Sequence, residues 1–270
     1  DPLTYARQHG AKAVIAIPNF LTLTNWKNSQ RIALQRGSLR PEMGSEAVAQ
    51  LPAITPSVPM VNALFAGEKI TGITALNRAA AGETGEPFDL NKKVSLTIGG
   101  IVEQVPTQNV IGILPGSDPV LKNEYVAIGA HYDHVGIGTP DAKGDAIYNG
   151  ADDDGSGTTG VLAIAEALAK SPRPKRSVLL VWHAGEEKGL WGSEYVTNNP
   201  PVPINQIVTQ LNIDMIGRSK KAGDTDPRNR ELSGPHEIYV IGSKMLSSEL
   251  GTLSERVNQN FLKLTFNYKY

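Results

Sequence analysis

The feature that most constrains the fold is a regular alternation of strand-sized and helix-sized apolar segments. Apolar runs at Tyr125–Ala130, Val178–Trp182 and Gln206–Ile213 predict three buried strands. Apolar residues at helical spacing between Val161 and Leu168 separate the first two strands, and a second helix is predicted at Leu190–Asn198. This order predicts right-handed βαβ units and a parallel sheet with helices on both faces, so the fold class is α/β.

Chemically reactive side chains follow each of the three predicted strands. The first strand continues into AHYDHVG (Ala130–Gly136), the second into HAGEEKG (His183–Gly189) and the third into NIDMIG (Asn212–Gly217). Three consecutive aspartates in GADDDGSG (Gly150–Gly157) lie between the first strand and its helix. Because the carboxyl ends of parallel strands meet at one edge of a sheet, we expect these motifs to converge in one crevice.

The charges in these motifs predict a metal site. Many carboxylates in one crevice are electrostatically costly unless cations neutralise them, and a histidine among them favours zinc or another transition metal over calcium or magnesium. His131 and Asp133 point the same way in extended backbone, so Asp133 is placed to orient a ligating imidazole. At the strand-to-loop turn, one of Glu186 and Glu187 can ligate a metal while its neighbour faces water as a general base.

Each motif also has a purely structural interpretation. A histidine at a strand end, such as His131, His134 or His183, is more often a satisfied core residue than a ligand. Asp152–Asp154 can act as helix N-caps, and Glu186–Glu187 can form a solvated helix start that favours the macrodipole. The joint placement of the motifs at successive strand ends favours a metal site over these separate explanations.

Composition excludes several other functions. The 270 residues are 40% hydrophobic and 20% charged, which suits one large folded domain and a smaller one. The net charge of -1 provides no general attraction to nucleic acid or anionic membranes. The sequence contains no cysteine, which excludes disulfides, thiolate ligands and cysteine nucleophiles. Its apolar runs are far shorter than the roughly 20 residues that cross a bilayer, so no membrane span is expected.

A change of pattern near residue 90 predicts two domains, 1–90 and 91–270. The second begins with alternating apolar residues, which predict two half-buried strands. These residues are Val94, Leu96 and Ile98 in the first strand and Ile111 and Ile113 in the second.

The four motifs AHYDHVG, GADDDGSG, EEKGLWGS and NIDM resemble, in this order, the co-catalytic zinc aminopeptidases of peptidase family M28. The resemblance covers roughly Val110–Gly217 and implies a mixed, mainly parallel sheet flanked by helices, of the zinc exopeptidase type. More weakly, HGAKAVIAI and LPAITPSVPMVNALFAGEKI resemble a protease-associated domain, which makes residues 1–90 a partial domain of that kind. The implied partner is a peptide substrate.

The resemblance implies a role for each matching residue. His131 and Asp214 correspond to ligands of one zinc ion, Glu187 to a ligand of the other, and Asp153 to the carboxylate that bridges both. The complete protein is therefore expected to bind two zinc ions.

Three further residues match positions that support the ligands. Glu186 corresponds to the general base. Asp133 corresponds to the partner that orients His131, and Asp154 to the residue that follows the bridging carboxylate.

One departure from the family pattern concerns the second zinc. The family supplies a second histidine to that ion from a loop near the end of the catalytic domain. After Asp214 the sequence has only His236, in SGPHEIYVIG, which does not resemble that loop. The chain begins without methionine and ends inside a predicted strand, at Phe266–Tyr270, so we expect a fragment that stops before the ligand loop.

The predicted reaction is hydrolysis of a peptide bond next to a free amino terminus. One alternative is a carboxypeptidase or dipeptidase with the same metal core and a pocket for a substrate carboxylate. Another is an inactive scaffold of the same fold, as the transferrin receptor branch implies. A transferase like glutaminyl cyclase is disfavoured, because that branch uses one zinc. Because many relatives are exported, a periplasmic or extracellular location is favoured; side-chain preference and oligomeric state are not readable.

Overall fold

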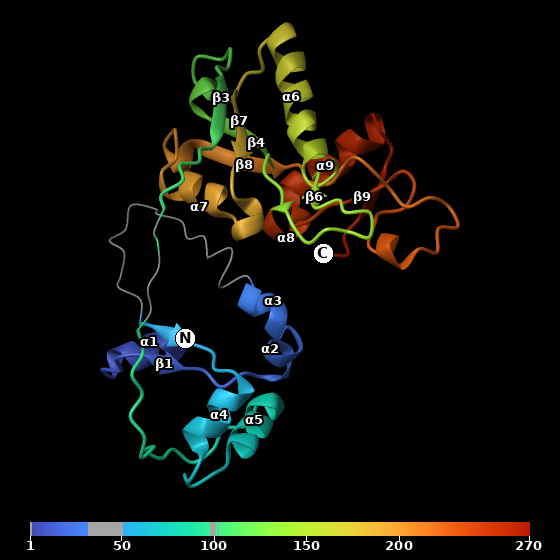
Figure 1. The fold of residues 1–270 in the computed structure, drawn as a ribbon. Helices are drawn as coiled ribbons and strands as arrows, with labels where there is room; N and C mark the ends of the chain where they lie inside the picture. The colour runs from blue at the N-terminus through green and yellow to red at the C-terminus, as the bar shows by residue number, and fades with distance from the viewer. Residues whose placement is uncertain (1, 32–50, 98–100, 102) are drawn as a thin grey trace. The chain divides into compact units, whose positions relative to one another are not determined.

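The computed structural model describes residues 2–31, 51–97, 101 and 103–270, and its chain forms two compact units (Figure 1). The units are Asp1–Gln104 and Val105–Tyr270. The sequence pattern placed this boundary near residue 90, whereas the division of the structure falls after Gln104.

The first unit is a small α/β assembly. Its two short strands, β1 (Val14–Ile15) and β2 (Ala53–Ile54), are parallel. Its helices are α1 (Pro2–Gln8), α2 (Phe20–Thr24), α3 (Trp26–Arg31), α4 (Val58–Phe65) and α5 (Gly72–Ala81). The contact between α4 and α5 buries Val61, Leu64 and Ala75. The assignment of this unit to a protease-associated domain stays a prediction.

The second unit is built on a four-stranded mixed sheet. Its strands are β3 (Val110–Leu114), β4 (Tyr125–His131), β7 (Ser177–His183) and β8 (Ile207–Asn212). Their order across the sheet is β3-β7-β4-β8. Strand β4 pairs in parallel with both of its neighbours, and β3 is antiparallel to β7. The predicted mixed, mainly parallel sheet is confirmed.

Helices cover both faces of this sheet, as the alternating sequence pattern predicts. Helix α6 (Gly155–Lys170) lies along one face, and α7 (Trp191–Asn198) packs on the other (Figure 1). The core under α6 consists of Ala130, Val161, Val178 and Leu180. On the opposite face, Val196 packs against Ala127, Leu179 and Val181. Alternate residues of the central strands therefore enter two different cores, which fixes the direction of each side chain at the strand ends.

One predicted strand is wrong in the part that the structure describes. Val94 and Leu96 lie in a segment without regular secondary structure, and both are exposed, while Ile98 lies outside the described residues. The other predicted strand, with Ile111 and Ile113, is β3 and pairs with β7. Apolar alternation alone does not make a strand without a partner for its backbone groups.

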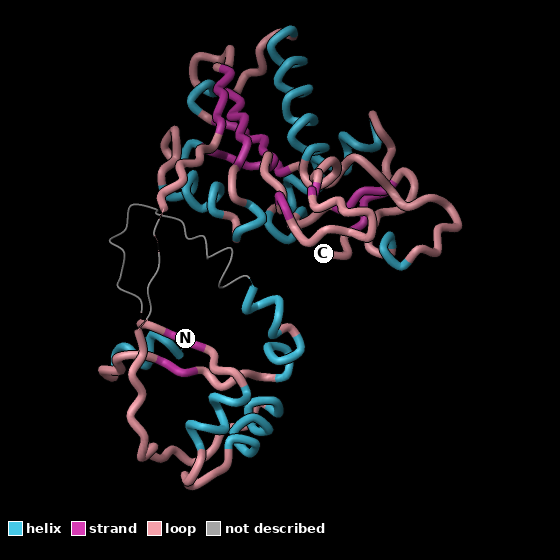
Figure 2. Tube along the Cα trace, in the orientation of Figure 1, coloured by secondary structure: helices cyan, strands magenta, loops and turns pink. Residues whose placement is uncertain are grey.

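The remaining elements lie together on the side of the unit where α6 begins (Figure 1 and Figure 2). They are β5 (Gly136–Ile137) and β6 (Ile147–Tyr148), which form an antiparallel pair, the parallel pair β9 (Glu237–Tyr239) and β10 (Thr265–Asn267), and helices α8 (Ser243–Leu246) and α9 (Ser248–Asn260). Short 3-10 turns lie at Leu121–Asn123, Glu186–Lys188, Ile204–Gln206 and Pro227–Asn229.

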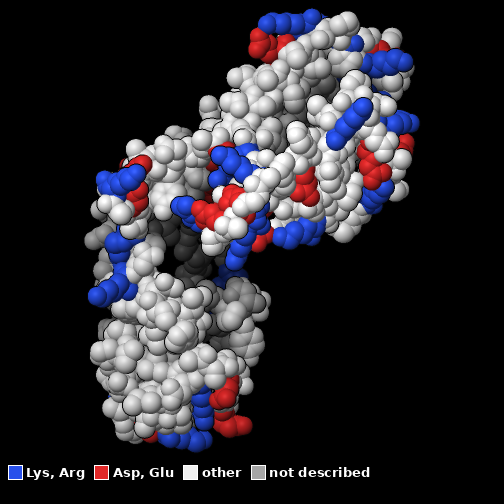
Figure 3. Space-filling model, turned by 90° about the vertical axis from the view of Figure 1, so that its right-hand side faces the viewer, with Lys and Arg blue, Asp and Glu red and all other residues white. Residues whose placement is uncertain are grey.

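The surface carries both signs of charge. On the face drawn in Figure 3, basic and acidic side chains are interspersed, in keeping with the net charge of -1. Within the described residues, no helix has the length and apolar character needed to cross a membrane.

The two-sided core predicts a sharp contrast between two leucines. Leu179, in β7, is 1% exposed, whereas Leu162, in α6, is 60% exposed. We expect Leu179→Ala to lower the free energy of unfolding by about 2–5 kcal/mol, because it removes buried methyl groups and leaves a cavity. The matched control, Leu162→Ala, should change it by no more than about 0.5 kcal/mol. Urea unfolding followed by circular dichroism measures both, and equal losses would contradict the proposed core.

Candidate metal centre

The carboxyl ends of three parallel strands bring the sequence motifs together. Strand β4 ends at His131 and lies in register with β7, so that His131 faces His183 across the ladder. Strand β8 ends at Asn212, and Ile213 donates a backbone hydrogen bond to the carbonyl of Gly129, which keeps the following Asp214 at the same edge. The convergence expected from the parallel order is confirmed.

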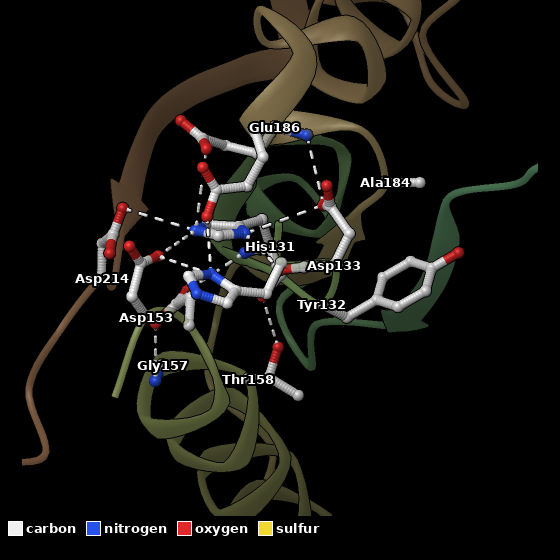
Figure 4. Close-up of polar contacts among 12 residues, drawn as sticks. His131, Tyr132, Asp133, Asp153, Gly157, Thr158, Ala184, Glu186 and Asp214 are labelled. Atoms are coloured by element: carbon white, nitrogen blue, oxygen red, sulfur yellow. Dashed lines mark hydrogen bonds and ion pairs between the residues drawn. The ribbon is translucent and has the colours of Figure 1, made fainter. Parts of the chain in front are cut away.

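His131 forms the centre of the first donor group. Its side chain is 3% exposed, and its Nδ1 donates a hydrogen bond to the backbone carbonyl of Asp133 at 3.0 Å. Because a carbonyl only accepts, Nδ1 carries the proton and Nε2 is free to ligate in the neutral ring. Nε2 lies 3.1 Å from Asp153 Oδ1, 3.8 Å from Asp214 Oδ2 and 3.9 Å from Glu186 Oε2 (Figure 4).

A second donor group shares Asp153 with the first. His134 Nδ1 lies 2.6 Å from Glu187 Oε1 and 3.9 Å from Asp153 Oδ1. The same oxygen of Asp153 thus faces both imidazoles. In each of the two groups, His131–Asp153–Asp214 and His134–Asp153–Glu187, the possible ligand atoms lie within 4.8 Å of one another.

Several of these donor atoms are buried without a hydrogen-bond partner. Among the described residues they include His131 Nε2, His134 Nδ1 and Glu187 Oε1. His134 and Glu187 are close in distance but are not aligned as a hydrogen bond. Such an approach fits donors arranged around a common cation, because their lone pairs then point at the ion instead of at each other.

The ionisation of the cluster reflects crowding of carboxylates. Burial raises the pKa of Glu186 and of Asp214, and neighbouring carboxylates raise it further, although His131 opposes them. Burial lowers the pKa of His131, but the carboxylates of Asp154, Glu186 and Asp214 outweigh it, so the pKa is raised overall. Each group is stabilised in its protonated form, and a cation between them would favour the ionised carboxylates instead.

Asp154 is a structural residue at the centre of the site. It is 1% exposed and is the N-cap of α6, so the capping interpretation is correct for this aspartate. Its Oδ1 accepts from the backbone N–H groups of Gly157 (2.9 Å) and Met215 (3.3 Å), and its Oδ2 from that of His131 (3.2 Å). Burial raises the pKa of Asp154 to about 6. The peptide bond that joins it to Asp153 is cis.

Gly157, in the first turn of α6, allows this arrangement. A Cβ at this position would overlap both the carbonyl oxygen of Ile213 and the carboxylate of Asp154. The start of α6 can therefore approach the segment after β8 only because this residue has no side chain.

Asp152 contacts the segment after β8 through a separate set of bonds. Its Oδ1 accepts from the N–H of Gly217 at 2.8 Å, and its Oδ2 accepts from Arg218 Nε at 2.8 Å. The three consecutive aspartates therefore have different surroundings, although the sequence presents them as equivalent.

Asp133 contacts His131 in a way that the sequence did not predict. The expected contact was between its carboxylate and the imidazole, but Oδ1 lies 3.7 Å from Nδ1, too far for a hydrogen bond. The backbone carbonyl of Asp133 accepts from the ring instead, while Oδ1 accepts from the N–H of Glu186 at 3.2 Å. Asp133 thus connects the exit of β4 with the turn that carries Glu186.

His134 is the site residue to which sequence reasoning gave no functional role. Its position three residues after His131, just beyond the end of β4, was the available signal. His183, the other histidine at a strand end, is buried, and burial lowers its pKa. It belongs to neither donor group among the described residues.

The fold and the donor set define a class of protein: an α/β protein that gathers histidine and carboxylate ligands for cations at its strand ends, as metal-dependent hydrolases do. Comparison with known proteins makes this specific. The chain belongs to peptidase family M28, whose family model matches residues 109–262, more than half of the chain.

Curated relatives carry peptidase names. A probable zinc metalloprotease of Pyrenophora tritici-repentis is 31% identical over 172 residues, which cover 62% of this chain and 38% of that protein. Leucine aminopeptidase 2 of Trichophyton equinum is 32% identical over 164 residues, covering 60% of this chain and 29% of that protein. The chain thus spans well under half the length of these relatives.

Among solved structures, the Legionella pneumophila LapA aminopeptidase is similar to this chain. The TM-score is 0.44 at 22% sequence identity, and the match covers 59% of this chain and 37% of that one.

The buried Asp154 predicts a pH-dependent stability in metal-free protein. Its pKa is raised from 3.8 to about 6, so the folded chain binds more protons than the unfolded chain between these values. Stability therefore falls as pH rises through this window. Asp154→Asn removes the titration, so in EDTA the difference in free energy of unfolding, wild type minus variant, should decrease between about pH 4 and about pH 6.5. Urea unfolding at several pH values measures this difference. A difference that stays constant or grows with pH would contradict a raised pKa of Asp154 in the folded chain.

Proposed function

We propose that the protein is a zinc-dependent exopeptidase of the aminopeptidase type, which binds two zinc ions and uses Glu186 as its general base. The observation that carries this proposal is the position of Asp153. One of its carboxylate oxygens lies 3.1 Å from the imidazole of His131 and 3.9 Å from that of His134. A single carboxylate shared by two donor groups is the arrangement that a pair of metal ions requires.

The donor chemistry fits zinc. Imidazole nitrogen and carboxylate oxygen are ordinary zinc ligands, and the buried atoms without hydrogen-bond partners belong to these side chains. His131, Asp153 and Asp214 would hold one ion, and Asp153 and Glu187 would hold the other. Zinc, when bound, lowers the pKa of a coordinated water and polarises the carbonyl of the scissile bond.

Glu186 is suited to proton transfer. It lies in the turn that follows β7, partly exposed at 33%, with Oε2 3.9 Å from His131 Nε2. Burial and the neighbouring carboxylates raise its pKa, which brings it nearer to neutral pH and makes it a better proton acceptor. In the proposed reaction Glu186 takes a proton from the attacking water and later donates it to the leaving amine.

The base can be tested separately from the metal. Glu186→Gln keeps the shape of the side chain but cannot accept the proton, so we expect kcat to fall by at least about 100-fold. Zinc content, measured by elemental analysis, should remain that of the wild type. The matched control is Glu166→Gln, which alters an exposed glutamate paired with Lys170 on α6 and should leave both quantities unchanged. Full activity in Glu186→Gln would eliminate the assigned base.

The end of the substrate can be tested with two kinds of compound. An aminopeptidase needs a free amino terminus, so we expect amino-acid anilides to be hydrolysed and N-blocked dipeptides to be resistant. Rates with both sets, before and after zinc is removed by a chelator and restored, provide the measurement. Preferential cleavage of the blocked dipeptides would identify a carboxypeptidase or dipeptidase. Failure with both sets by the zinc-loaded chain would favour an inactive scaffold.

A further inference from the structure

The second donor group contains an imidazole that the family pattern does not assign. The resemblance supplies a histidine to the second zinc from a loop late in the catalytic domain. In the structure, the histidine next to Glu187 is His134, which comes from the exit of β4. We propose that His134 Nδ1 is itself a ligand of the second zinc ion, together with Asp153 and Glu187; this inference rests on the two-zinc site proposed above.

The position of His134 supports ligation. Nδ1 is buried and lies 2.6 Å from Glu187 Oε1 and 3.9 Å from Asp153 Oδ1. Its side chain is 21% exposed, and the side chains of Glu187 and Asp153 are 20% and 36% exposed. The three donors therefore form a partly open site, as expected for a catalytic metal that must keep a position for water or substrate.

A simple hydrogen bond does not explain the contact. His134 Nδ1 and Glu187 Oε1 are within hydrogen-bond distance, yet neither atom has a hydrogen-bond partner, because the approach is misaligned. A neutral imidazole that ligates through Nδ1 carries its proton on Nε2 and needs no alignment with the carboxylate. Ligation accounts for the poor angle; since two ligand atoms of one tetrahedral zinc lie roughly 3.3 Å apart, His134 Nδ1 and Glu187 Oε1 would separate when the ion binds.

The backbone holds the imidazole in this place. Gly150, which opens the acidic motif, has a φ of +63°, and a Cβ there would lie 2.7 Å from the Cβ of His134 and 2.8 Å from its Cγ. The loop that carries Asp153 thus packs directly against the histidine, and glycine makes this approach possible. His134 and Asp153 are fixed relative to each other by this contact.

No other histidine in the described residues occupies this group. His183 is buried beside β4, and His236 is exposed in the segment before β9. His9 lies in the first unit, where its ring stacks on Tyr5. Of the histidines in the described residues, His134 is therefore the one that lies beside Glu187.

The test measures zinc directly, by equilibrium dialysis and elemental analysis of the 270-residue chain. The wild type should bind two zinc ions. His134→Ala should retain one, with the affinity of the second site reduced by more than about 100-fold, since loss of an outer partner alone costs only about 10- to 100-fold. Asp153→Asn, which alters the shared ligand, should weaken both sites.

His134→Gln separates ligation from positioning. Glutamine can still donate a hydrogen bond to Glu187 but is a poor zinc ligand, so it should behave like His134→Ala. Cobalt substitution provides a second readout, since the visible absorption of the second cobalt equivalent should change in both His134 variants. The control is His236→Asn. Asparagine tolerates the left-handed backbone at this position (φ 57°), so this variant should bind two zinc ions. Circular dichroism in EDTA checks that every variant is folded.

The outcomes distinguish this inference from the proposed function. Two zinc ions in folded His134→Gln, with affinities within about 100-fold of wild type, would overturn the ligand role and leave the peptidase proposal intact. A wild-type chain with two zinc ions, one lost in both His134 variants, would support the ligand role even if no peptide were cleaved. One zinc ion or none in the wild type would overturn the two-zinc proposal and, with it, the inference that rests on it.

Discussion

The site depends on one buried carboxylate that joins three separate segments of the chain. Asp154 accepts hydrogen bonds from the end of β4, the first turn of α6 and the segment after β8, through the backbone N–H groups of His131, Gly157 and Met215. None of these bonds involves a side chain that faces the proposed metals. Asp154 thus aligns the backbone. Asp153, which precedes it in the chain, and Asp214, which precedes its partner Met215, both lie close to His131 Nε2 as a result.

This anchor places negative charges close together, and their mutual repulsion has to be balanced. The raised pKa values of Glu186 and Asp214 show that the folded chain favours protonated carboxyl groups at this edge. Cations would satisfy the same requirement while keeping the carboxylates ionised. Two adjacent aspartates therefore have different roles. Asp154 is buried and organises the backbone, whereas Asp153 is partly exposed and is available to bind a metal ion.

The sequence predicted the frame of the site well, because the frame is encoded by local patterns. Apolar periodicity identified β4, β7, β8 and α6, and the rule that loops converge at the carboxyl ends of parallel strands brought His131, Asp153 and Asp214 together. Details that depend on the path of single loops were not predictable. The contact of Asp133 with His131 uses a backbone carbonyl, and the place of His134 depends on the turn after β4. The strand predicted from the apolar alternation at Val94 and Leu96 is wrong, because strand formation also needs a neighbouring strand.

The absence of a side chain at Gly157 has a consequence for variation in this protein. Any larger residue would press on the carbonyl of Ile213 and the carboxylate of Asp154, so the helix would have to move away from the sheet edge. Because Asp153 is covalently bonded to the residue that caps this helix, the shift would carry it with the helix. A single added methyl group would thus distort the proposed metal site although the proposed ligands and the proposed general base all remain in the sequence. Inspection of the motif residues alone would not reveal this effect.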